Sequence, residues 1–154
     1  MGLARFIAEV FSRLRSSFFG SPAEAGDPRA LLGRAGEALA ARHLRKHRYK
    51  VLFRNFRAAR GGEVDIVCRD KSCNTLVFVE VKTRASTEFG RPGEAVKEEK
   101  QHLIARGALA WLRMLDNPQV MFRFDIVEVV MKAGAKPEIT IIPNAFPLPE
   151  PYVW

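Results

Sequence analysis

Long apolar runs and cysteines are scarce in this chain, and each scarcity excludes a class of protein. No run of about eighteen apolar residues occurs, so the sequence predicts no membrane-spanning helix. Cys68 and Cys73 are too few for a disulfide framework, and without a second pair they make a weak zinc signal. We therefore expect two reduced thiols in a cytoplasmic protein.

Recognition motifs for nucleic acid are also missing, although the charge favours a polyanion. The chain has neither a helix-turn-helix nor a zinc finger, and it has no internal repeat. Its 154 residues are enough for one domain with a real core, and the net charge is +8. Such a charge suits nucleic acid or an anionic membrane surface, and charge alone does not separate the two.

Composition divides the chain into three parts. Residues 1–26 combine an amphipathic helix over 3–19 with a linker rich in Ser, Pro and Gly. That basic helix suits a membrane surface, or docking on its own domain or on a second copy, and docking is the commoner outcome. Residues 27–143 form the predicted globular α/β domain, and residues 144–154 form a Pro-rich tail.

The order of predicted elements within the domain is α-β-β-β-α-β-β. Asp27-Pro28 gives a helix start, and the helix runs to about Lys46. A strand over 50–57, a hairpin, a helix over 94–115 and strands over 121–130 and 138–142 follow. This order predicts a central mixed sheet flanked by helices. The residues of the first helix expected to face the core are Leu31, Leu32, Ala35, Leu39 and Leu44.

The hairpin carries charge where its strands should be most apolar. Asp65 interrupts the first strand, and Glu80 and Lys82 interrupt the second. Placing Asp65 opposite Glu80 leaves a four-residue turn over 71–74 and fixes the register. One face of the hairpin is then apolar throughout, from Val64 to Val81, and the charges share the end of the other face.

Opposed carboxylates on neighbouring strands repel each other unless something lies between them. A hard divalent cation such as Mg²⁺ or Mn²⁺ would remove that penalty, because it prefers carboxylate and water oxygens. Lys82 projects from the same face as Glu80 and could reach a water or a phosphate. The alternative is a solvated surface hairpin whose ion pairs, such as Glu63 with Lys82, contribute at most about 1 kcal/mol.

An Asp followed about fifteen residues later by Glu-x-Lys resembles the PD-(D/E)xK nuclease superfamily. Within that superfamily, the sequence motifs of this chain most resemble those of the YraN-like family. The resemblance covers about 31–130, and it departs from the family at Arg48, where a glycine is usual. The matching segments are Gly36-Glu37, Arg54-Asn55-Phe56-Arg57, Gly62-Glu63-Val64-Asp65-Ile66-Val67, Val77-Phe78-Val79-Glu80-Val81-Lys82-Thr83-Arg84, Phe89-Gly90-Arg91-Pro92 and Arg123-Phe124-Asp125.

The resemblance implies a restriction-endonuclease-like α-β-β-β-α-β core and a Mg²⁺ or Mn²⁺ site. Asp65 and Glu80 would be the principal metal ligands, with the backbone carbonyl of Val81 as a third. Lys82 would orient the attacking water, and Glu37 would reach the metal through water. Glu63 is left as either a ligand or a salt-bridge partner. The implied activity is metal-assisted hydrolysis of a phosphodiester.

A basic surface around these acids would bind the phosphates of DNA. The absence of a base-reading motif favours DNA shape over DNA sequence, with branched or recombination and repair intermediates as candidate substrates. The alternative is a catalytically inactive nucleic-acid-binding domain of the same fold. The resemblance also makes a homodimer an expectation, because several nucleases of the superfamily are dimers. The residues expected to contact nucleic acid are Arg54, Arg57, Arg60, Arg84, Arg91, Lys97 and Lys100.

Overall fold

The computed structural model describes residues 27–85 and 96–154. The amphipathic helix predicted over 3–19 and the segment that contains Arg91 lie outside the described residues. The described elements are α2 (Pro28–Lys46), β1 (Tyr49–Arg57), β2 (Glu63–Asp70), β3 (Thr75–Arg84), α3 (Glu98–Met114), β4 (Phe122–Val130) and β5 (Glu138–Phe146).

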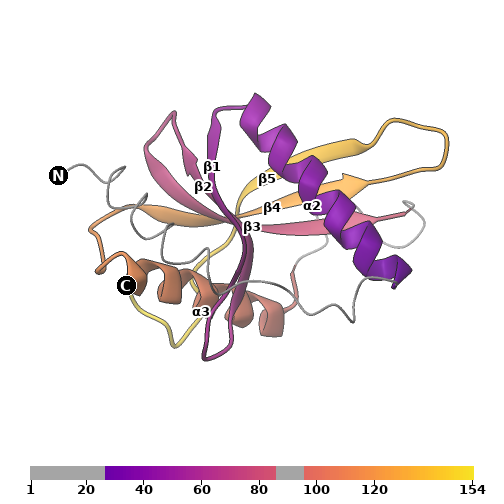
Figure 1. Cartoon of the computed structure of the whole chain (residues 1–154). Coiled ribbons are helices and arrows are strands. Elements are labelled where there is room, and N and C mark those ends of the chain that lie inside the picture. Colours follow the sequence, from indigo (N-terminus) through magenta and orange to yellow (C-terminus); the bar gives the residue numbers. More distant parts are fainter. Residues whose placement is uncertain (1–26, 86–95) are drawn as a thin grey trace.

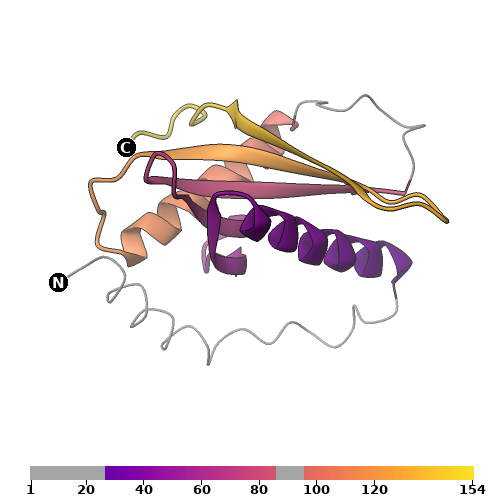
Figure 2. The same cartoon turned by 90° about the horizontal axis from the view of Figure 1, so that it is seen from above.

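The five described strands form one mixed sheet in the order β1-β2-β3-β4-β5. The pairs β1–β2, β2–β3 and β4–β5 are antiparallel, whereas β3 and β4 are parallel. Parallel neighbours need a crossover, and α3 supplies it. Figure 1 shows α2 and α3 on opposite sides of the sheet, and Figure 2 shows the same layers from above. The predicted α/β architecture of restriction-endonuclease type is confirmed.

Local sequence signals set the first helix. Asp27 is the N-cap, where its Oδ1 accepts a hydrogen bond of 3.0 Å from the backbone N–H of Arg29, and Pro28 follows at the first helical position. The helix ends at Lys46, as predicted. The start of α3 at Glu98 is four residues later than the expected Glu94, which lies outside the described residues.

Each face of the sheet has its own apolar core. Under α2, Ala40, Ala41 and Leu44 pack on buried side chains of the three central strands, including Ile66 and Val79. Under α3 the core is more aromatic. The ring of Trp111 lies 5.3 Å from that of Phe53 and 5.2 Å from that of Phe56, between ring centroids. Both faces of the hairpin are therefore buried over most of its length, whereas the sequence predicted one buried face.

The packing face of α2 differs from the predicted one. Leu31 is 50% exposed and Ala35 is exposed, whereas the buried residues of the helix are Gly36, Ala40, Ala41 and Leu44. Small residues at a spacing of four let the helix axis approach the sheet closely. The prediction was wrong at Leu31 and Ala35 because it ranked residues by hydrophobicity, whereas close approach selects by size.

The hairpin register is confirmed, since Ile66 pairs with Val79 and the turn covers 71–74. One detail of the predicted faces is wrong: Val64 packs in the core under α3, on the side opposite Ile66. The cause lies in β1, where Asn55 has φ 55°. Asn tolerates this left-handed backbone conformation, which turns Phe56 and its partner Val64 toward α3.

Candidate active site

Asp65 and Glu80 meet where β2 and β3 lie side by side. The backbone N–H of Val81 donates a hydrogen bond of 2.8 Å to Oδ2 of Asp65, which ties this carboxyl to the strand that carries Glu80. Burial raises the pKa of Glu80, and the neighbouring Asp65 raises it further. Burial also raises the pKa of Asp65, despite the hydrogen bond from Val81. A carboxyl whose ionisation is hindered by burial and by a neighbouring carboxylate, as that of Glu80 is, belongs to a site that favours a cation.

The environment of Glu80 tests whether a cation fits this site. The residue is 8% exposed, and its Oε2 is buried with no hydrogen-bond partner among residues 27–85 and 96–154. An unpaired buried carboxylate oxygen is costly, and a divalent ion would satisfy it. Within 27–85 and 96–154, no three His, Cys, Asp or Glu side chains form a ready ligand group. Two carboxylates and several waters are a usual set for Mg²⁺, so the residues fit that ion.

Lys100 lies inside the cluster rather than on the outer surface. Its Nζ pairs with Oε1 of Glu63 and lies 3.4 Å from Oε1 of Glu80. Glu63 also pairs with Arg57 through its other oxygen. Burial would raise the pKa of Glu63, but Lys100 and Arg57 outweigh burial and lower it. Glu63 is thus an ionised salt-bridge partner of Lys100 and Arg57, and Lys100 carries positive charge to the edge of the Asp65–Glu80 pair.

Close contact between two backbones holds Lys100 in this place. A Cβ on Gly107 would lie 2.9 Å from the backbone of Glu63, and a Cβ on Gly62 would lie 2.5 Å from the backbone nitrogen of Gly107. Only glycine allows helix α3 to touch the start of β2 so closely. The contact fixes the distance between the helix that carries Lys100 and the strand that carries Glu63 and Asp65.

Helix α2 brings Glu37 to the same cluster from the other side. Burial and then the charge of Asp65 raise the pKa of Glu37, while a hydrogen bond with Asn55 opposes the rise. The approach again depends on glycine, because a Cβ on Gly36 would lie 1.8 Å from Oγ1 of Thr83. Asn55 therefore has two effects: its left-handed backbone turns β1, and its side chain holds Glu37.

Lys82 follows Glu80 by two residues on β3 and is partly buried. In the parallel ladder it lies beside Glu128 of β4, a buried acid that is 5% exposed. Sequence reasoning missed Glu128, which sits in an apolar strand much as Asp65 and Glu80 do. That shared signal, an acid with apolar neighbours inside a strand, could have found it.

The predicted phosphate-binding residues that the structure describes lie in several places. Arg54 lies beside Glu37, and Lys100 lies in the carboxylate cluster. Arg57 and Arg60 border a surface pocket, and Arg84 and Lys97 lie at the end of β3 and at the start of α3. Arg91 is outside the described residues. The structure therefore brings Arg57 and Arg60 together but does not gather all seven residues into one patch.

Sequence reasoning also missed a second polar network, which lies toward the other end of β2 from Asp65. The guanidinium of Arg123 binds Asp125 through two hydrogen bonds of 2.8 and 3.0 Å and binds Asp70 at 3.0 Å. Tyr49 donates to Asp125 at 3.3 Å, and the backbone N–H of Asn144 donates to the same residue at 2.9 Å. These hydrogen bonds join β1, β2, β4 and β5 and stabilise the sheet.

No helix within the described ranges, 27–85 and 96–154, is long and apolar enough to cross a membrane. This agrees with the lack of a long apolar run in the sequence.

Comparison with known proteins places this site in a family. Residues 36–129 match the model of "Uncharacterised protein family UPF0102". The chain is similar to a UPF0102 protein of Geobacter metallireducens, at 50% identity over 117 residues, which are 76% of this chain and 93% of the relative. It is similar to one of Nocardia farcinica at 45% over 124 residues, or 80% and 94% of the two chains. The matched range contains Glu37, Asp65, Glu80 and Lys100.

Proposed function

The chain belongs to the UPF0102 family, the YraN type of restriction-endonuclease-like protein, and we propose that it is a metal-dependent endonuclease acting on DNA. One observation carries the proposal. Asp65 and Glu80 come from adjacent strands to a shared position, and one buried oxygen of Glu80 has no hydrogen-bond partner in the described part of the chain. A domain that only bound nucleic acid would gain nothing from the cost of such a pair.

The roles of the residues follow from their positions. Asp65 and Glu80 would hold Mg²⁺ or Mn²⁺, with the carbonyl of Val81 as a further ligand. When bound, the ion supplies positive charge that balances the scissile phosphate and makes water easier to deprotonate. Lys82 donates hydrogen bonds to the attacking water or to a phosphate oxygen. Glu37 orients water from the α2 side, and its raised pKa suits it to hold a proton there.

Lys100 supports the second candidate function, a catalytically inactive nucleic-acid-binding domain. Its ammonium lies 3.4 Å from Glu80 and already offsets part of the negative charge that a metal ion would balance. In such a domain the ion pairs Lys100–Glu63 and Lys100–Glu80 would replace the metal as the stabilising element. The free thiols of Cys68 and Cys73 fit a cytoplasmic location for either function.

Cleavage assays on branched, flapped and linear DNA, with Mg²⁺, Mn²⁺ or EDTA, distinguish the two functions. We expect Asp65→Ala, Glu80→Ala and Lys82→Ala each to abolish metal-dependent cleavage, a loss of at least about a hundredfold, while the folded state persists. Glu99→Ala and Lys71→Ala are the matched controls, since both residues are exposed and lie outside the cluster. Unchanged turnover in all three cluster variants would reject the enzyme, and binding without any cleavage would favour the inactive domain.

A further inference from the structure

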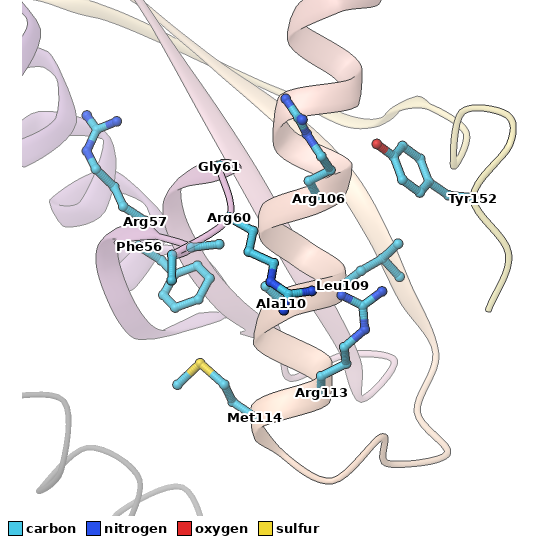
Figure 3. Close-up of a pocket in the computed structure, with 12 residues that line it drawn as sticks. Phe56, Arg57, Arg60, Gly61, Arg106, Leu109, Ala110, Arg113, Met114 and Tyr152 are labelled. Atoms are coloured by element: carbon cyan, nitrogen blue, oxygen red, sulfur yellow. The ribbon is translucent and has the colours of Figure 1, made fainter.

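A pocket of about 590 Å³ lies on the outer side of α3, beside the candidate active site. Its walls are the loop over 58–61 between β1 and β2, the exposed face of α3, and Tyr152 from the C-terminal segment (Figure 3). The volume falls within the range of about 300–1,000 Å³ that is usual for small-ligand sites. The pocket is thus large enough for a nucleobase and its sugar.

The lining of this pocket combines an apolar floor with a basic rim. Phe56, Leu109, Ala110 and Met114 supply apolar surface, and Tyr152 adds an aromatic ring at the mouth. No acidic residue lines the pocket within the described part of the chain, whereas its lining includes the arginines Arg57, Arg60, Arg106 and Arg113. An apolar surface among so many cations selects a ligand that is flat and apolar in one part and anionic in another.

The pocket is connected to the carboxylate cluster. Figure 3 shows Arg60 lying across the face of α3, whereas the side chain of Arg57 points away from that helix. Arg57 pairs with Glu63, and Glu63 pairs with Lys100, whose ammonium contacts Glu80. Gly61 in the pocket wall precedes Gly62, which touches Gly107 of α3. A strand bound in the pocket would therefore lie beside the ion pairs that lead from Arg57 through Glu63 and Lys100 to Glu80.

We propose that this pocket binds an unpaired nucleotide of the substrate, with the base on the apolar floor and the flanking phosphates on the arginines. The inference rests on the proposed function, since it assigns the substrate class of that site: DNA with a single-stranded portion next to the cleaved bond. Bases stack on apolar and aromatic side chains regardless of sequence, and arginines bind both phosphates and base faces. An apolar segment of another protein would instead place the guanidinium groups of Arg60, Arg106 and Arg113 against apolar side chains.

Fluorescence anisotropy in EDTA, which prevents cleavage, tests the pocket separately from the chemistry. The probes are a labelled single-stranded oligothymidylate and a labelled blunt duplex. Ala110→Glu places a negative charge in the pocket, and Arg113→Ala removes a rim charge. Arg42→Ala is the matched control, because Arg42 is exposed on α2, across the sheet. Circular dichroism checks that each variant is folded.

We expect Ala110→Glu to weaken binding of the single strand by about tenfold or more, the scale of one lost stacking contact, and to change duplex binding much less. Arg113→Ala should weaken the single strand and reduce the slope of log affinity against log salt by about one. Arg42→Ala should leave both probes within about twofold. Equal weakening of both probes by Ala110→Glu would overturn the assignment to an unpaired nucleotide.

Unchanged single-strand affinity in folded Ala110→Glu would also overturn it, and a simultaneous change in sedimentation would assign the pocket to a protein contact. The cleavage assay keeps the two proposals distinguishable. Loss of single-strand binding in Ala110→Glu, together with no cleavage of any DNA by the wild-type chain, would retain the pocket and reject the enzyme. Metal-dependent cleavage that Ala110→Glu does not alter on flapped or branched DNA would retain the enzyme and reject the pocket.

Discussion

At the scale of single residues, Glu80 is the group whose ionisation works against folding. Its carboxyl is buried beside Asp65, so its pKa in the folded protein lies above the ordinary 4.5. The folded state then binds more protons than the unfolded state at any pH between the two values. Stability must fall as pH rises through that window.

The variant Glu80→Gln, studied in EDTA, tests whether Glu80 causes this fall in stability with rising pH. The amide cannot ionise, so we expect the free energy of unfolding of the variant to decline less than that of the wild-type chain as pH rises above about 4.5. The raised pKa values of Asp65 and Glu37 account for the decline that remains. Thermal or urea unfolding at a series of pH values measures it. Glu99→Gln, an exposed acid on α3, should retain the wild-type profile. An identical decline in Glu80→Gln and the wild type would show that Glu80 ionises normally.

The same scale shows what sequence can and cannot predict about the site. Asp65, Glu80 and Lys82 were predictable because charge in an otherwise apolar strand is costly and therefore informative. Lys100 and Asn55 were not assigned their places in the cluster, because polar residues on a helix or at a strand bend are ordinary on a surface. Only the packing of α3 on Glu63 and the positive φ of Asn55 reveal that they join the cluster.

At the scale of elements, two glycines in α2 have opposite effects on stability. A Cβ on Gly36 would overlap Thr83, whereas a Cβ on Gly33 would meet no described residue within 4 Å. We expect Gly33→Ala to stabilise the protein by about 0.5–1 kcal/mol through helix propensity. Gly36→Ala should destabilise it by about 1–3 kcal/mol, because the helix must move away from β3.

Urea unfolding of the pair measures both signs, and cleavage assays add a functional readout. Displacement of α2 also moves Glu37 away from Asp65, so Gly36→Ala should lower activity while Gly33→Ala should not. If both alanines stabilised the chain equally, the close contact between α2 and β3 would be absent.

The element scale also explains where the predicted fold was right. The hairpin register followed from its charge pattern, because a slip by one residue would mix charged and apolar side chains on both faces. The placement of Val64 failed because a strict alternation of faces assumes a regular strand. The bend at Asn55, which turns Phe56 and Val64 toward α3, is a tertiary feature with no signal in the hydrophobic pattern.

At the scale of the whole molecule, the Arg123 network joins strands from both ends of the chain. Asp125 is 0% exposed and accepts bonds from Arg123, Tyr49 and Asn144. Asp125→Asn would leave a buried guanidinium short of one carboxylate, at a cost of about 3 kcal/mol. Glu138→Gln is the control, since it alters a surface pair with Lys132 of 3.0 Å and should cost under about 1 kcal/mol.

Urea unfolding measures both changes, and a loss in Asp125→Asn no larger than that in Glu138→Gln would contradict the structural role of the network. Asp70 also binds Arg123, so its charge contributes to the same network. Burial would raise the pKa of Asp70, but hydrogen bonds from Ser72 and Arg123 outweigh burial and lower it. Stability from Asp70 is therefore present above its ordinary value of 3.8 and is lost as pH falls further.

Isothermal titration with Mn²⁺ tests the central claim most directly, because it asks whether Asp65 and Glu80 share one cation. We expect one ion per chain in the wild type and in Glu99→Gln, and loss of detectable binding in both Asp65→Asn and Glu80→Gln. Equal Mn²⁺ binding by all four proteins, or none by the wild type, would contradict the claim.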